Sequence, residues 1–346
     1  MHIDMKKILL SLLLLGIVFP TAYRASAQEK PWMKHINFSG YYQAGFSVTD
    51  ALDNTFYIKR ARLAFTGDLY KGDYGTFEYK VQAEFAGSPK LVDYFVKWTV
   101  CDEFGFQFGQ FKNLVTVENS EYAPLKLEMI DYSLVVQRFA RMSGSDLFLG
   151  ASATGREMGF QFYGKWFPMA DGHALVRYNV GLFNGNGINK TDDDRCKNFQ
   201  ARVMIFPVKD FSISGCYERR IGHMDEIPIY NDYDYRILDR YGVCLAYDGK
   251  IGWLRSEYMA GHTYGERAEG AYVTAGYRIT PTFNIGARYD YFNANSKWQG
   301  FEQRYITVGT SWHPFQRLRL QLNYTHKQEA DGHTSQMVNL MSSIIL

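Results

Sequence analysis

The chain has 346 residues, of which 46% are hydrophobic and 21% are charged, with a formal net charge of +2. This composition excludes a disordered or low-complexity protein, because enough apolar surface is present for burial. The mean hydropathy of −0.29 excludes a bundle of membrane helices. Aromatic residues reach 16% and include 26 tyrosines, an excess typical of proteins that lie at a lipid–water boundary.

The first 27 residues have the pattern of a secretory signal peptide. Lys6 and Lys7 precede an apolar run that ends at Phe19, and Ala25-Ser26-Ala27 forms a small-residue cleavage site. The run is shorter than the roughly 20 residues that a membrane-spanning helix needs. We therefore expect residues 1–27 to be removed and residues 28–346 to form one secreted domain. Three basic residues and one acidic residue leave with the peptide, so 35 of each sign remain, and this balance argues against a nucleic-acid partner.

Recognisable catalytic and cofactor-binding motifs are missing from the sequence. The four cysteines form no C-x-x-C pair and have no histidine at metal-ligand spacing. Dinucleotide-binding, P-loop, nucleophile-elbow and zinc-protease patterns are absent as well. We therefore expect neither an enzyme nor a bound metal or cofactor.

Most of the mature sequence consists of segments in which apolar and polar residues alternate. Between Phe77 and Phe85, for example, every second residue is apolar, whereas Glu78 and Lys80 lie between them. A period of two indicates a strand with one apolar and one polar face. Sixteen such strands are predicted, in chain order, at 35–47, 56–69, 75–86, 90–100, 103–112, 156–167, 173–184, 198–206, 209–219, 238–248, 251–261, 269–280, 282–293, 302–313, 315–327 and 334–346.

The connections between these strands are alternately short and long, which is typical of a transmembrane β-barrel with short periplasmic turns and long extracellular loops. A secreted β-sandwich would also alternate, but it favours shorter and fewer strands. Aromatic residues near the strand ends predict two girdles at the membrane surfaces. These are Tyr41, Tyr42, Tyr70, Trp98, Trp166, Phe167, Tyr289, Tyr291 and Trp312. We predict an all-β, antiparallel transmembrane barrel of about 16 strands.

The connection 113–155 is too long and too apolar for an exposed hairpin loop. Stretches such as Leu134-Val135-Val136 need a surface to pack against. Folding back into the barrel would bury them and constrict the pore. The alternative is a protruding loop at a subunit interface or receptor surface.

If the apolar face of each strand meets lipid, the polar face lines a water-filled lumen. Charged rings in such a channel decide which ions enter. Alternation places basic residues on this face, and our candidates for an anion pathway are Arg60, Arg62, Lys80, Arg202, Arg255, Arg288 and Arg319. Acids share the same face, so pairing that stiffens the wall is an equally open role for each of them. Cys216 and Cys244 also share this face on neighbouring strands, either as a disulfide or as free thiols.

Several short motifs resemble the phosphate-selective porin family of the O and P type. They are Lys59-Arg60-Ala61-Arg62-Leu63-Ala64-Phe65, Phe77-Glu78-Tyr79-Lys80, Phe108-Gly109-Gln110-Phe111-Lys112, Gly185-Asn186-Gly187-Ile188-Asn189 and Phe199-Gln200-Ala201-Arg202. The resemblance implies a homotrimeric, sixteen-stranded barrel in the outer membrane of a Gram-negative bacterium, with an inward-folded third loop and a basic lumen. It adds Lys112, at the family's G-Q-F-K position, to the candidate pathway.

The sequence therefore predicts an outer-membrane porin for passive diffusion of small anions such as phosphate, in contact with membrane lipid. One alternative is a general or sugar-type diffusion channel, in which tyrosines would stack against the solute. The other is an adhesin or receptor barrel that uses the outer loops 185–197 and 220–237, including the run from Tyr230 to Tyr235.

Overall fold

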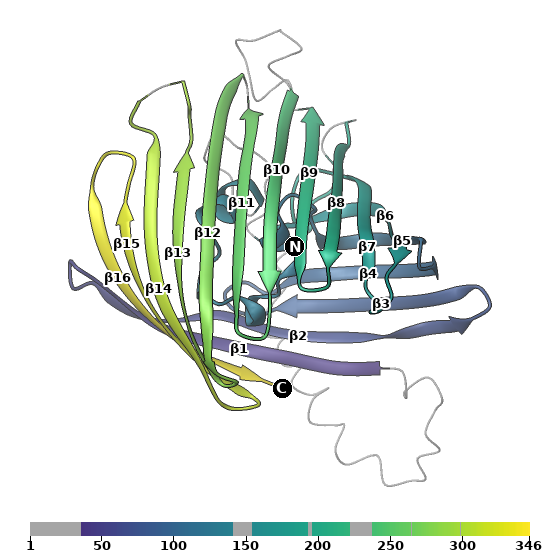
Figure 1. Cartoon of the computed structure of the whole chain (residues 1–346), viewed down its shortest axis with the longest axis horizontal. Coiled ribbons are helices and arrows are strands. Elements are labelled where there is room, and N and C mark those ends of the chain that lie inside the picture. Colours follow the sequence, from purple (N-terminus) through teal and green to yellow (C-terminus); the bar gives the residue numbers. More distant parts are fainter. Residues whose placement is uncertain (1–35, 141–153, 193–195, 222–236, 264, 298) are drawn as a thin grey trace, which may run out of the picture. The chain divides into compact units, whose positions relative to one another are not determined.

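The computed structural model describes residues 36–140, 154–192, 196–221, 237–263, 265–297 and 299–346 (Figure 1). In these residues sixteen strands form one closed barrel, and all of it except the first two residues of the first strand lies in the compact unit Phe38–Leu346. The strands are β1 (Ile36–Thr49), β2 (Asn54–Gly72), β3 (Gly75–Glu84), β4 (Lys90–Cys101), β5 (Phe104–Lys112), β6 (Arg156–Pro168), β7 (Ala174–Phe183), β8 (Asn198–Val208), β9 (Phe211–Ile221), β10 (Ile237–Asp248), β11 (Gly252–Thr263), β12 (Glu266–Thr280), β13 (Phe283–Asn293), β14 (Glu302–Phe315), β15 (Leu318–Gln328) and β16 (Thr334–Ile345).

Each strand pairs with its neighbours in sequence, and the barrel closes where β1 pairs antiparallel with β16, with Tyr42 opposite Ile344. Closure gives every strand two partners, so no row of backbone donors and acceptors is left at an edge. The predicted fold class and strand number are confirmed, and the predicted strand boundaries differ from the observed ones by only a few residues.

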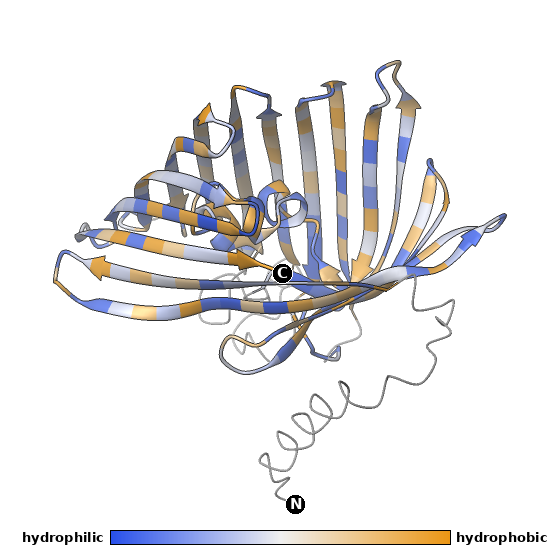
Figure 2. Cartoon of the chain, turned by 90° about the horizontal axis from the view of Figure 1, so that it is seen from below, coloured by the Kyte–Doolittle hydropathy of each residue, from blue (hydrophilic) through white to orange (hydrophobic). Residues whose placement is uncertain are grey.

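Hydrophilic and hydrophobic residues alternate along most strands (Figure 2). In β10 the lumenal Arg240 and Cys244 are buried, whereas Val243 is 60% exposed on the outer surface. The predicted girdle needs one correction. Tyr42 is exposed, but Tyr41 is buried, because adjacent strand residues point to opposite faces. Tyr41 therefore belongs to the lumen and not to the girdle.

The third loop connects β5 to β6, and its residues 113–140 fold into the barrel as predicted. Its described part contains α2 (Val117–Glu121), the 3-10 helix η2 (Pro124–Lys126) and the π-helix η3 (Val136–Ala140). Loop residues such as Val135 and Phe139 share a buried apolar cluster with Met259, Tyr272 and Phe292 of the barrel wall. The lumenal wall thus supplies the surface that the apolar loop requires.

The remaining predictions are only partly covered by the described residues. Residues 1–27 and the run from Tyr230 to Tyr235 lie outside them. Cys216 and Cys244 are free thiols, because the register places them opposite Gly242 and Ser214 and not opposite each other. None of the helices in the described ranges has the length and apolarity required to cross a bilayer.

Candidate functional site

Carboxylates of the barrel wall hold the third loop by its backbone. Glu257 on β11 accepts hydrogen bonds from the amides of Val117 (2.8 Å) and Glu118 (2.7 Å). Asp290 on β13 accepts one from the amide of Leu134 (2.9 Å). These three loop amides donate to side chains of the wall and not to the backbone of a neighbouring strand. A buried amide without an acceptor would lower the stability of the fold. The wall therefore determines the path of the loop.

Arginines of the same wall hold the loop by its carbonyl oxygens. Arg319 on β15 donates to the carbonyls of Leu125 (2.6 Å) and Leu127 (2.7 Å). Arg288 on β13 donates to the carbonyl of Asp131 at 2.8 Å, and Arg240 on β10 donates to Phe139 at 2.9 Å. These contacts place the loop against β10–β15.

Arg255 on β11 also contacts the loop. It donates to Glu128 at 2.8 Å and to Tyr272 at 3.1 Å, and its guanidinium lies 3.9 Å from the centre of the Tyr122 ring. Three of the predicted pathway residues, Arg255, Arg288 and Arg319, therefore anchor the loop instead of standing free in the channel.

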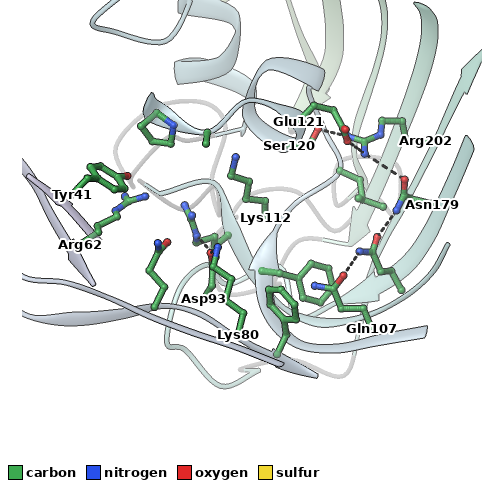
Figure 3. Close-up of a pocket in the computed structure, with 18 residues that line it drawn as sticks. Tyr41, Arg62, Lys80, Asp93, Gln107, Lys112, Ser120, Glu121, Asn179 and Arg202 are labelled. Atoms are coloured by element: carbon green, nitrogen blue, oxygen red, sulfur yellow. Dashed lines mark hydrogen bonds and ion pairs between the residues drawn. The ribbon is translucent and has the colours of Figure 1, made fainter. Parts of the chain in front are cut away.

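A cavity of about 370 Å³ remains between the loop and the opposite wall, β1–β8. Five cations and two carboxylates line it, so cations outnumber carboxylates by three among the lining residues. The cations are Arg62, Lys80, Lys112, Arg156 and Arg202, and the carboxylates are Asp93 and Glu121. Figure 3 shows Lys112 near the middle of this group, with Arg62, Lys80 and Arg202 around it.

Shared partners organise these charges. Asp93 binds Lys80 and Arg156 at once, each at 2.6 Å, so one carboxylate serves two cations. Arg202 bonds to Glu121 and Ser120 of the loop. Lys112 donates to the carbonyl oxygen of Tyr122 at 2.9 Å. Because cations outnumber carboxylates in the lining, the cavity has a positive field.

The candidate pathway residues fall into three groups. Arg62, Lys80, Lys112 and Arg202 come together at the cavity. The three loop-anchoring arginines lie on the far wall, where Arg319 also lines a second cavity of about 400 Å³. Arg60 lines neither of the two cavities and donates to Gln43 at 2.8 Å. Its neighbour Arg62 pairs with Glu84 at 2.7 Å.

Arg156 is the cavity cation that sequence reasoning missed. Alternation puts it on the same face as Phe160 and Phe162, which point outward in β6. It is the first residue of that strand, however, and its bond to Asp93 draws it inward. Strict alternation holds within a strand and fails at its ends. Its position directly after the long loop could have indicated that Arg156 faces inward, since it lies opposite Lys112.

An ion pair between Lys59 of β2 and Asp131 joins the loop to the cavity side of the barrel. Burial alone would raise the pKa of Asp131, but the positive charges of Lys59, Arg288 and Arg60 outweigh burial and hold it below its ordinary value. A carboxyl with a lowered pKa stabilises the docked loop above its ordinary pKa, and this contribution is lost as the pH falls through the lowered value.

We therefore expect open-channel current noise to rise when single channels are moved from pH 7 to about pH 3, since the ordinary pKa of aspartate is about 3.9. Asp131→Asn should show increased noise at both pH values. Equal pH dependence in the variant and the parent would contradict a role for this pair.

Comparisons with known proteins agree with this architecture. The family model described as phosphate-selective porin O and P matches residues 29–209 and 234–343. No curated protein matches the chain. Among solved structures, an anion-selective porin from Comamonas acidovorans is 12% identical, with a TM-score of 0.68 over 90% of this chain and 99% of that one.

Two further solved structures are similar. The outer membrane channel DcaP of Acinetobacter baumannii is 14% identical, with a TM-score of 0.61 over 90% of this chain and 97% of that one. The trimer form of OmpT, an outer membrane protein of Vibrio cholerae, is 11% identical, with a TM-score of 0.62 over 90% of this chain and 99% of that one. At such identities these structures support the fold alone. The family match spans most of the chain, and the chain therefore belongs to the phosphate-selective porin O and P family and is an outer-membrane porin.

Proposed function

We propose that this porin forms a water-filled channel for passive diffusion of small anions such as phosphate. The observation that carries the proposal is the surplus of cations at the cavity between the third loop and β1–β8. Fixed positive charge lowers the free energy of an anion there and raises that of a cation. Residues 28–346 would act as one domain, with 113–155 as its constriction and 1–27 as its signal peptide. We infer a homotrimer in the membrane, without cofactor or covalent chemistry.

The reversal potential of the channel in a planar bilayer tests the proposal. Under a KCl gradient the potential should have the sign of chloride permeation, and adding phosphate should reduce the chloride current. A potential of the opposite sign would overturn the anion assignment.

Arg60 and Arg62 offer a matched comparison on one strand. Arg62→Ala should lower the anion preference, because Arg62 lines the cavity and its loss leaves Glu84 without its 2.7 Å partner. Arg60→Ala should have a smaller effect, since Arg60 lies outside the cavity lining. Reversal potentials of the two variants compare them directly, and an equal or larger effect of Arg60→Ala would contradict this assignment.

A further inference from the structure

A belt of amide side chains crosses the cavity wall and ends at one of the cations, Arg202. Gln107, Gln161 and Asn179 come from the neighbouring strands β5, β6 and β7, and Arg202 follows on β8. The register places Gln107 opposite Gln161 and Asn179 opposite Arg202. All four line the same cavity (Figure 3).

Hydrogen bonds run along the belt in one direction. Arg202 donates to the side-chain oxygen of Asn179 at 3.3 Å. The amide nitrogen of Asn179 donates to the oxygen of Gln161 at 3.0 Å, and the nitrogen of Gln161 donates to the oxygen of Gln107 at 2.9 Å.

Arg202 determines this direction. A guanidinium has only donors, so the amide next to it must present its oxygen. With its oxygen toward Arg202, Asn179 points its nitrogen at the oxygen of Gln161. Gln161 in turn points its nitrogen at the oxygen of Gln107. Because the oxygen of Gln107 accepts from Gln161, the nitrogen of Gln107 lies on the other side of its amide, and it makes no side-chain hydrogen bond within the part of the chain that is described.

The surroundings strengthen this terminal donor. Gln107 is 7% exposed, and the apolar rings of Phe95 and Phe111 line the same cavity. A hydrogen bond to an anion is stronger beside apolar groups than in open water. Successive amides oriented alike also polarise one another.

We propose that the belt forms an uncharged oxyanion subsite, in which the amide nitrogen of Gln107 binds an oxygen of the solute after it leaves the cationic group. Asn179 and Gln161 are positioning residues that keep this nitrogen facing the cavity. The inference rests on the proposed anion channel and adds a preference for oxyanions over chloride, which positive charge alone does not provide. An oxyanion with several acceptor oxygens gains more from an amide donor than chloride does.

The test is the block of single-channel chloride current by inorganic phosphate. Gln107→Met removes the donor without changing charge and should raise the half-blocking phosphate concentration roughly fivefold, the loss expected for one hydrogen bond. Asn179→Leu removes the hydrogen bonds that orient Gln161 and, through it, Gln107. It should raise the half-blocking phosphate concentration by less, roughly threefold. The reversal potential in KCl is recorded for both variants as a separate measure of the cationic group, whose charge neither substitution changes.

Gln82→Met is the matched control, because Gln82 lines the same cavity but lies outside the belt. Its half-blocking concentration should equal that of the parent channel. Unchanged block in Gln107→Met, or an equal increase in Gln82→Met, would overturn the subsite while the anion channel stands. A parent channel without anion preference would overturn the proposed function and the subsite with it. Single-channel recording reports only on folded channels, so a folding defect does not imitate either result.

Discussion

Channels that carry Lys80→Gln and Lys112→Gln together should lose most of their preference for anions. The two substitutions remove two of the three surplus positive charges at the cavity and keep polar side chains of similar reach. At about 7 Å in water-like surroundings one unit charge contributes about 0.6 kcal/mol, so two charges change the free energies of the anion and the cation by about 1.2 kcal/mol each, in opposite directions, and their loss should change the anion-to-cation permeability ratio roughly fiftyfold. The reversal potential under a KCl gradient measures this ratio.

The cavity should tolerate these substitutions without rearranging. Asp93 keeps Arg156 at 2.6 Å when Lys80 is removed, so this buried carboxylate does not lose its last cation. Lys71→Gln with Arg317→Gln is the matched control, since both residues are exposed and lie at or beside turns between strands. The control removes the same charge far from the cavity. A shift of the potential as large as that of the test pair would contradict selectivity at the cavity.

Replacing residues 120–148 by a short Gly-Ser linker should increase single-channel conductance by roughly twofold or more, since a sixteen-stranded barrel without an inserted loop encloses an open channel. The described part of this segment is held inside the barrel by Arg288 and Arg319. The barrel itself should survive, because its strands are joined by a closed backbone ladder that does not involve the loop.

Removal of residues 330–332, in the exposed connection between β15 and β16, controls for loop shortening in general. This control should conduct like the parent channel. Unchanged conductance in the 120–148 variant would contradict the constriction and would favour a surface role for the loop.

The fold could be predicted from the sequence because its signals are local. Alternation in segments such as Phe77–Phe85 reports directly on a strand with one lipid face and one water face. The loop 113–155 was recognisable as inward-folded because an apolar segment of that length needs a covering surface. The girdle prediction was wrong at Tyr41, because adjacent strand residues point to opposite faces and Tyr42 takes the outer one. Arg156 was missed because it is the first residue of its strand and its face depends on its bond to Asp93.

The roles of the lumenal cations could not be predicted in this way. Arg62 and Arg288 occupy equivalent lumenal positions on their strands, yet one lines the cavity and the other holds the loop. Their difference arises from the path of the loop, which is set by contacts between residues more than a hundred positions apart, such as Val117 and Glu257. No pattern within a single strand contains this information.

The sequence by itself determined the strand number, the lipid and lumen faces and the presence of an inserted loop, because side-chain alternation and apolar burial act over a few residues. The tertiary structure alone decided which cations surround the cavity and how the amide belt is oriented. Barrel closure and loop docking bring distant side chains together, and electrostatic and hydrogen-bond energies depend on those distances.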